Sequence, residues 1–330
     1  MCLRVRTVWK VHMDNVQILM ATYNGSEFLA QQIDSIRSQT HRYWSLLISD
    51  DGSQDDTQQI IEEYAGLDER IHAIDEPNPL PGNAARNFSH LLRHATGDYV
   101  MLCDQDDVWA PTKIEVTLRR MHQLEQEVGR EEAELLVFTD MAVVDQDGQV
   151  TQPSFERYMH IDTTRLTLPP LLAQPLGAGC TMMVNKALVQ AYQKTPPTQM
   201  MSMHDWWLSL IAAGCGRIAY LDVPTSSYRQ HGTNSVGATG YSPKRMIANA
   251  RMIADGIWET VDQARSFREV YGDRVDPAYR DALDAYCAID DPKISRRIRA
   301  RFASHVWKSG FVRRAGELAV TLVGRRRKAS

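Results

Sequence analysis

Short apolar runs alternate with stretches of helical periodicity through the first 146 residues. Five runs have the composition of buried strands, and the segments between them repeat their apolar residues at helical spacing. The predicted strands cover residues 16–22, 43–49, 70–75, 98–103 and 134–145, and the predicted helices cover residues 26–39, 55–66, 83–96 and 111–129. Such alternation predicts an α/β fold with a mostly parallel sheet flanked by helices. Ligands bind these sheets at the carboxyl ends of the strands.

Individual residues set the expected ends of the helices. Asp55 and Asp56 cap the second helix, which stops at Gly66. The helix over 111–129 opens with Pro111 and carries its charges on the outer face. After residue 146 the pattern loosens: we expect strands over 177–185 and from 216 into a loop near 232, and helices over 186–194 and 204–216. From Pro243 onward the pattern predicts a helical extension.

Polar residues gather where the predicted strands end. Thr22-Tyr23-Asn24-Gly25 follows the first strand, Asp50-Asp51-Gly52-Ser53 the second, and Asp104-Gln105-Asp106-Asp107 the fourth. Asn24-Gly25 is a favourable turn, and the alternative role for this stretch places Tyr23 against a base and backbone amides near phosphate. Asp50 and Asp51 either form an acidic turn or accept hydrogen bonds from a pyrimidine or a ribose.

The acidic cluster after the fourth strand has two interpretations. Asp106 or Asp107 caps the helix after Pro111, or the cluster is a solvated turn. Alternatively, a divalent cation lowers the mutual repulsion of the carboxylates. Mg²⁺ held by one or two carboxylates takes its remaining ligands from water and substrate phosphates. A cluster at the end of a strand therefore suits a nucleoside diphosphate.

The composition of the chain indicates a cellular compartment, and its charge distribution indicates a surface for a partner. The chain has 330 residues, 43% of them hydrophobic, which is enough for a large core. It contains no apolar run of transmembrane length and no secretory signal, and its five scattered cysteines form no CxxC pair. We therefore expect a cytoplasmic protein with reduced thiols.

The net charge of −4 conceals an asymmetry. From Lys293 onward there are twelve Lys or Arg residues and one acid, Glu317, so this segment carries +11 and the preceding chain −15. Phe311, Ala315, Leu318 and Leu322 stand there at helical spacing. The segment either docks on the core or lies on the anionic inner face of the cytoplasmic membrane. No aromatic-interleaved motif accompanies the charge, so we expect no nucleic-acid partner.

The ordered motifs ILMATYNGSEFL, SLLISDDGSQDDT, PGNAARNF, GDYVMLCDQDDVW and MHDWW resemble family-2 inverting glycosyltransferases of the GT-A fold. DQDDVW followed by YRQHGTNSVG is most similar to the bacterial rhamnosyltransferase-like subgroup, which builds O-antigen and other surface polysaccharides. The resemblance implies a GT-A, Rossmann-like domain over 14–240. Its nucleotide-sugar half would be 14–110 and its acceptor half 134–240, followed by a basic helical region over 241–330.

The resemblance also implies roles for individual residues. Asp51 would face the base, Asp104 the ribose, and Arg86 would help to place the donor. Mg²⁺ or Mn²⁺ on the diphosphate would be held by Asp106 and His231, imidazole being an acceptable ligand for Mn²⁺. The full set implied for donor binding is Thr22, Tyr23, Glu27, Asp51, Arg86, Asp104 and Arg229.

HDWW at 204–207 matches the acidic dipeptide of the family, with His204 in place of its usual Glu. Asp205 then matches the catalytic base, which takes the proton of the acceptor hydroxyl. Its alternative role is the N-cap of the following helix. Trp206 and Trp207 are expected to pack in the core, although an indole face also suits a sugar.

The expected activity is transfer of a sugar, with rhamnose from dTDP-rhamnose as the favoured donor, to a polyprenyl-linked saccharide. UDP-hexose transfer and a non-catalytic nucleotide-sugar scaffold are the alternatives. A nucleotidyltransferase is disfavoured, because TYNGSEF contains no Arg or Lys for a triphosphate.

Overall fold

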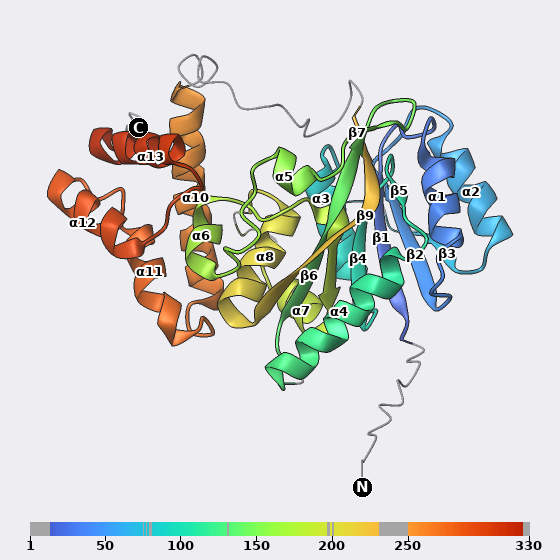
Figure 1. The fold of residues 1–330 in the computed structure, drawn as a ribbon, viewed down its shortest axis with the longest axis horizontal. Helices are drawn as coiled ribbons and strands as arrows, with labels where there is room; N and C mark the ends of the chain where they lie inside the picture. The colour runs from blue at the N-terminus through green and yellow to red at the C-terminus, as the bar shows by residue number, and fades with distance from the viewer. Residues whose placement is uncertain are drawn as a thin grey trace, which may run out of the picture.

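A twisted nine-stranded sheet forms the centre of the computed structural model (Figure 1). The structure describes residues 14–230 and 250–325, except Asp75, Pro77, Pro79, Leu80, Glu131, Pro197, Thr198 and Met200. The strands are β1 (Val16–Thr22), β2 (Trp44–Asp50), β3 (Ile71–Ala73), β4 (Tyr99–Asp104), β5 (Val108–Trp109), β6 (Leu135–Val144), β7 (Val150–Gln152), β8 (Met182–Asn185) and β9 (Arg217–Arg229).

The strand order is β3-β2-β1-β4-β8-β6-β9-β5, with β7 paired to β6. β1 is parallel to β2 and β4, β2 to β3, and β6 to β9, whereas β8 is antiparallel to both of its neighbours. Asp50 is in register with Thr22, and Asp104 with Ala21. The three polar strand ends of the sequence therefore meet at one edge, as predicted.

Helices cover both faces of the sheet. The helices before β9 are α1 (Leu29–Arg37), α2 (Thr57–Leu67), α3 (Ala84–His94), α4 (Lys113–Val128), α5 (Phe155–Tyr158), α6 (Leu168–Ala173), the 3₁₀ turn η1 (Gly179–Thr181), α7 (Lys186–Gln193) and α8 (His204–Cys215). Alternate residues of β1 and β4 point to opposite faces. Ile18 and Met101 pack with α1, α2 and α4, whereas Leu19 and Leu102 pack with α3, α6, α7 and α8. The α/β prediction is confirmed.

Several predicted boundaries differ from the structure. Gly66 lies inside α2, which ends at Leu67, and α4 begins at Lys113 rather than at Pro111. The predicted strand over 177–185 begins as η1 and becomes β8 only at Met182. The short elements β5, β7, α5 and α6 were not predicted, because two to six residues carry no measurable periodicity.

In the described part of the chain after β9, the helices are α10 (Ala250–Tyr271), α11 (Pro277–Cys287), α12 (Ile294–Ser304) and α13 (Phe311–Val323). Trp258, Phe267 and Tyr286 of α10 and α11 belong to the same apolar core as α6 and α8. The C-terminal helices therefore extend the core on one side of the sheet. The predicted boundary at residue 240 lies outside the described residues, so the domain limits remain a prediction. Within the described part of the chain, no helix has the length and hydropathy needed to span a bilayer.

Candidate active site

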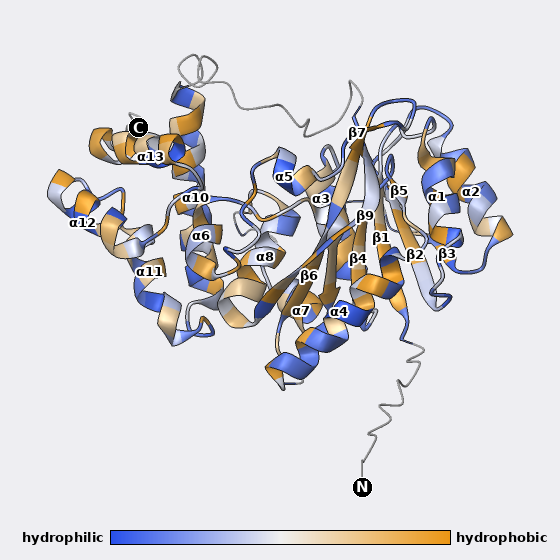
Figure 2. Ribbon diagram, viewed as in Figure 1, coloured by the Kyte–Doolittle hydropathy of each residue, from blue (hydrophilic) through white to orange (hydrophobic). Residues whose placement is uncertain are grey.

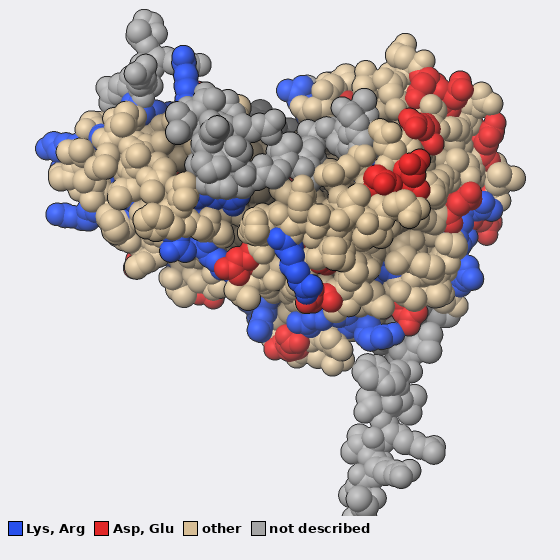
Figure 3. Space-filling view, turned by 45° about the horizontal axis from the view of Figure 1, so that its top comes forward, with Lys and Arg blue, Asp and Glu red and all other residues tan. Residues whose placement is uncertain are grey.

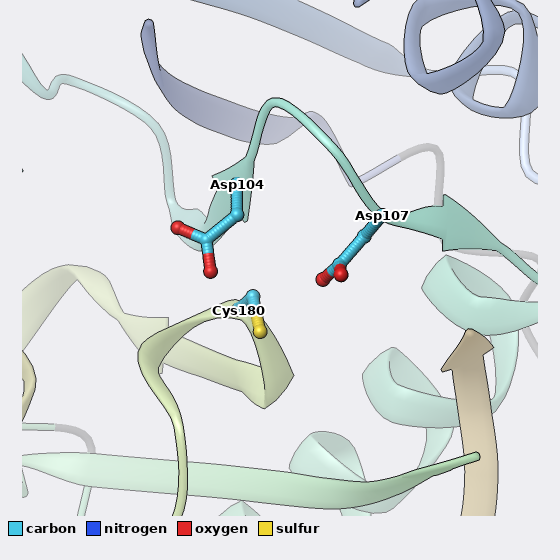
Figure 4. Close-up of side chains that lie close together, drawn as sticks. All are labelled: Asp104, Asp107 and Cys180. Atoms are coloured by element: carbon cyan, nitrogen blue, oxygen red, sulfur yellow. The ribbon is translucent and has the colours of Figure 1, made fainter. Parts of the chain in front are cut away.

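The acidic turn after β4 brings two carboxylates against a thiol. The ligand atoms of Asp104, Asp107 and Cys180 all lie within 4.8 Å of one another, and Figure 4 shows the three side chains converging. Asp107 is 1% exposed, and neither of its carboxylate oxygens has a hydrogen-bond partner within the described chain. A buried carboxylate without hydrogen-bond donors is unfavourable, so a cation or a donor at these oxygens would stabilise the pocket.

The protonation of these groups follows from their burial and proximity. Burial, together with the nearby Asp106, raises the pKa of Asp104 to about 7. Burial and the charge of Asp104 raise the pKa of Asp107 well above its usual range. Burial likewise raises the pKa of Cys180, which is therefore a neutral thiol at pH 7. The oxygen ligands are those of the aspartates, which suits a hard cation such as Mg²⁺ or Mn²⁺.

Lys113 lies behind the acidic turn and was missed by the sequence analysis, which placed the charges of this helix on its outer face. Its side chain is fully buried, and its Nζ donates to Thr225 Oγ1 at 3.0 Å and stacks over Trp109. Thr225 Oγ1 in turn lies 2.6 Å from Thr139 Oγ1. Burial lowers the pKa of Lys113, and the charge of Asp107 opposes this shift. The lysine thus supplies a positive charge beneath the carboxylates.

Asp106, the predicted metal residue, lies in the same turn but outside the Asp104–Asp107–Cys180 group. Its backbone carbonyl accepts a hydrogen bond from Arg229 Nε at 3.3 Å. Arg229 is 5% exposed, donates to Gln31 Oε1 at 2.7 Å and stacks over Phe28. Arg229 therefore fastens the turn to α1. His231 lies outside the described residues. α4 is capped by Thr112, so the interpretation of Asp106 or Asp107 as its cap is wrong.

Two hydrogen bonds join the ends of β1 and β4. The Gln105 amide accepts from Tyr23 N at 2.9 Å and donates to Tyr23 O at 3.0 Å. A side chain at Gly25 would collide with this amide, since its Cβ would lie 2.2 Å from Gln105 Oε1. The Tyr23 side chain is 55% exposed and free to contact a ligand.

The backbone amides of the β1 loop are already used inside the protein. Asn24 N donates to Ser53 Oγ at 2.8 Å, Gly25 N to Thr57 Oγ1 at 2.8 Å, and Ser26 N to an Asp55 oxygen at 3.1 Å. The suggestion that these amides lie near phosphate stays a prediction. They lock the loop to the start of α2.

The other predicted donor residues surround the same edge in different environments. Thr22 is buried, and its hydroxyl donates to Asp50 Oδ1 at 2.9 Å, so it shapes the loop from within. Asp51 accepts from Asn78 Nδ2 at 3.1 Å and from Gly82 N at 2.7 Å. Glu27 and Arg86 are both exposed, and Arg86 lies in the first turn of α3.

Asp205 faces the acidic turn from α8. Its charge adds a small contribution to the raised pKa of Asp104, so the two carboxylates lie near each other. Asp205 Oδ2 accepts from Gly179 N at 3.1 Å. The N-cap of α8 is Met203, so the capping role for Asp205 is wrong. Trp206 and Trp207 are buried packing residues, as expected.

His204 lies beside Asp205 in the first turn of α8. It is 5% exposed and stacks on Phe88 of α3 with ring centroids 4.3 Å apart. Neither ring nitrogen has a hydrogen-bond partner within the described residues. A Cβ on Gly179 would lie 3.2 Å from both His204 Nε2 and Asp205 Cβ. Gly179 therefore allows the backbone to reach both side chains.

A further buried acid, Glu156, lies behind the same loop. It is 2% exposed, its carboxylate has no hydrogen-bond partner among the described residues, and Oε1 would lie 2.8 Å from a Cβ on Gly177. Burial and the charge of Asp140 raise its pKa to about 8. Glu156 is therefore mostly neutral at pH 7. Its helix, α5, is too short to be visible as a pattern in the sequence.

Comparison with known proteins identifies the family to which this chain is similar. Residues 17–130 match the family model described as "Glycosyl transferase family 2". The chain is 29% identical to "dTDP-rhamnosyl transferase RfbG" of Shigella flexneri over 66% of this chain and 74% of that protein. It is 32% identical to "Putative glycosyltransferase EpsE" of Bacillus subtilis (strain 168) over 60% and 67% of the two chains.

Solved structures support the same fold. The S. aureus TarS 1–349 complex with UDP-GlcNAc superposes with a TM-score of 0.50 at 16% identity, covering 93% of this chain and 90% of that chain. The mannosyltransferase PcManGT from Pyrobaculum calidifontis, in complex with GDP-Man and Mn²⁺, gives 0.50 at 15% identity and covers 87% and 73%. The fold is that of the GT-A glycosyltransferases. The chain belongs to glycosyltransferase family 2, which confirms the resemblance and the enzyme class predicted from the sequence.

Gly179→Ala should impair transfer without weakening donor binding. The added methyl group would lie 3.4 Å from Asp205 Oδ2 and closer still to Asp205 Cβ, so the carboxylate must move by a few tenths of an ångström. We expect kcat to fall about tenfold. Steady-state kinetics and donor titration measure the two effects. The control is Gly66→Ala within α2, where the methyl group meets nothing within 4 Å. A wild-type kcat for Gly179→Ala would contradict this role of the loop.

Glu156→Gln should reduce the loss of stability as the pH rises from 5 to 8. Glu156 keeps its proton in the folded state up to pH of about 8, whereas the unfolded carboxyl ionises near 4.5. Unfolding thus releases a proton between these values, and the free energy of unfolding falls as pH rises. Between pH 5 and 8 we expect the wild type to lose about 1 kcal/mol or more relative to the variant in urea unfolding. The exposed Glu115→Gln is the control, and parallel pH profiles would refute the assignment.

Proposed function

We propose that this chain is a metal-dependent inverting glycosyltransferase that moves a sugar from a nucleoside-diphosphate donor to a saccharide hydroxyl. The carrying observation is that Asp205 accepts a hydrogen bond from the amide of Gly179, the residue before Cys180, and so lies near the Asp104–Asp107–Cys180 group. One carboxylate is thereby available as a base opposite a group of carboxylates suited to a diphosphate-bound cation.

The reaction is a single displacement at the anomeric carbon. The acceptor O–H gives its proton to Asp205 as its oxygen bonds to that carbon, while the bond from the carbon to the diphosphate oxygen breaks. A divalent cation held by Asp104, Asp106 or Asp107 would supply Lewis-acid stabilisation of the departing diphosphate. The unpartnered oxygens of Asp107 support this fit. Lys113 partly balances the negative charge from behind.

Donor binding would use the edge where β1, β2 and β4 end. Asp51 would face the base, and the exposed Tyr23, Glu27 and Arg86 would contribute from the same edge. Arg229 fits a positioning role better than direct donor contact, because its guanidinium is bonded to Asp106, Gln146 and Gln31.

Rhamnose from dTDP-rhamnose is the proposed donor, and bacterial surface polysaccharide the proposed product. The description of RfbG as a dTDP-rhamnosyl transferase supports this choice. WfgD of Escherichia coli is described as acting on a diphosphoundecaprenol-linked sugar, which supports a polyprenyl-linked acceptor at the inner face of the cytoplasmic membrane. UDP-hexose transfer is the second candidate, and it is favoured by the UDP-GlcNAc complex of TarS. A thermal-shift panel of nucleotide sugars with Mn²⁺ separates the two donors.

Asp205→Asn should reduce transfer by about a thousandfold and leave donor affinity within a few fold, because the amide cannot accept the acceptor proton. Initial rates and donor titration test this expectation. Asp98→Asn, which removes an exposed ion pair with Lys186, is the matched control. Undiminished turnover by Asp205→Asn would refute the base. Donor binding by the wild type without hydrolysis or transfer would instead favour a scaffold.

Asp106→Ala should remove metal-dependent transfer and raise the Mn²⁺ concentration needed for half-maximal thermal stabilisation with a nucleoside diphosphate by about tenfold. Asp147→Ala, at an exposed turn, controls for loss of surface charge. If Asp106→Ala kept the wild-type thermal stabilisation by Mn²⁺ and Asp107→Asn lost it, the metal would be assigned to Asp107 instead. Full activity in a chelator would refute metal dependence.

A further inference from the structure

The last helix is packed with its polar side inward. On α13, Glu317 is 1% exposed and Thr321 is fully buried, whereas Phe311 is 86% exposed and Val323 79% exposed. The exposed apolar or small residues of this helix are Phe311, Val312, Ala315, Ala319, Leu322 and Val323. At 3.6 residues per turn these six positions occupy roughly 120° of the helix circumference. We call this continuous strip the apolar arc.

Buried polar contacts fix this orientation. Glu317 forms an ion pair with Arg301 at 3.4 Å, and both side chains are almost completely buried. Glu317 Oε2 also accepts from Lys308 N at 2.8 Å. Arg297 donates to the carbonyl oxygens of Thr321 and Leu322, which end the helix.

Rolling α13 to bury the apolar arc would therefore leave buried charges without partners, which is strongly unfavourable. The interpretation of this segment as a helix docked on the core is thus confirmed, whereas the membrane interpretation stays a prediction. The helix does dock on the protein, but by its polar side, and it leaves its apolar side outward.

Basic residues flank the apolar arc. Arg313 and Arg314 lie on either side of it by helical position, and Arg314 Nε donates to Lys308 O at 3.3 Å. Arg325 follows its end and is paired with Asp262 at 2.6 Å, and the sequence continues Arg326-Arg327-Lys328. α12, which packs against α13, exposes Phe302 by 54% and Ile294 by 50%. Figure 2 shows the apolar character of α13, and Figure 3 shows Lys and Arg at the end of the molecule formed by the C-terminal helices, with acids gathered at the opposite end.

We propose that the apolar arc of α13 inserts into the interface of an anionic lipid bilayer, with the flanking arginines on the lipid phosphates. A surface helix with an apolar face and basic edges has the chemistry of such a site. A second copy fits less well, because a two-fold contact would place the same basic segment against itself. In Figure 1, α13 lies toward the end of the molecule at which β1 terminates, so a docked enzyme would hold its active-site edge near the membrane.

This proposal rests on the proposed function, which places the acceptor at the cytoplasmic membrane. Vesicle binding requires no catalysis, so the two proposals can fail independently. The test is co-sedimentation of the full chain with vesicles of phosphatidylcholine, with or without phosphatidylglycerol. We expect binding to the anionic vesicles, weakened by salt. The double variant Phe311→Ser/Val323→Ser should lower the partition coefficient by about tenfold or more.

The control is Leu67→Ser, which removes an equally exposed apolar side chain (70%) from α2 and should leave vesicle binding unchanged. Retained melting temperature and retained transfer to a water-soluble acceptor show that the double variant is folded. Undiminished vesicle binding by the double variant would overturn the proposal, as would equal binding to phosphatidylcholine alone. A concentration-dependent dimer in light scattering that the double variant loses, without vesicle binding, would assign the arc to a second copy.

Discussion

The structure depends on carboxylates kept out of water at the end of β4. Their placement is unfavourable in isolation, since burial raises the pKa values of Asp104 and Asp107, and the oxygens of Asp107 have no hydrogen-bond donor among the residues that the structure describes. The surrounding structure holds them there: Gln105 ties the turn to β1, Arg229 ties it to α1, and Lys113 supplies a charge beneath it. Because these carboxylates are held close together and out of water, they would stabilise a bound cation more than an exposed acidic turn would.

The arrangement of the strands was accessible from the sequence because it rests on local pattern. Buried strands of six or seven residues and amphipathic helices gave the α/β layers, and the polar residues that follow β1, β2 and β4 indicated the edge of the site. The antiparallel course of β8 was not predictable, because strand direction depends on the long connection before it rather than on its own four residues.

Candidate site residues were predictable where a local sequence motif indicates their role. They were not predictable where the role depends on contacts with an element that is distant in the sequence. Asp205 and the acidic turn were recognised in this way. Lys113 was missed because a lysine in the first turn of a charged helix resembles a surface residue, and only the packing of α4 against β9 buries it. Arg229 was expected on the donor, but its partners on α1 and in the β6–β7 turn are separated from it by more than eighty residues.

The contact between Gly179 and Asp205 has an evolutionary consequence. Within the described residues, the proposed base is oriented by a main-chain amide rather than by a side chain. Mutations of the neighbouring loop residues could thus reshape the surface offered to an incoming saccharide while Asp205 stays in place.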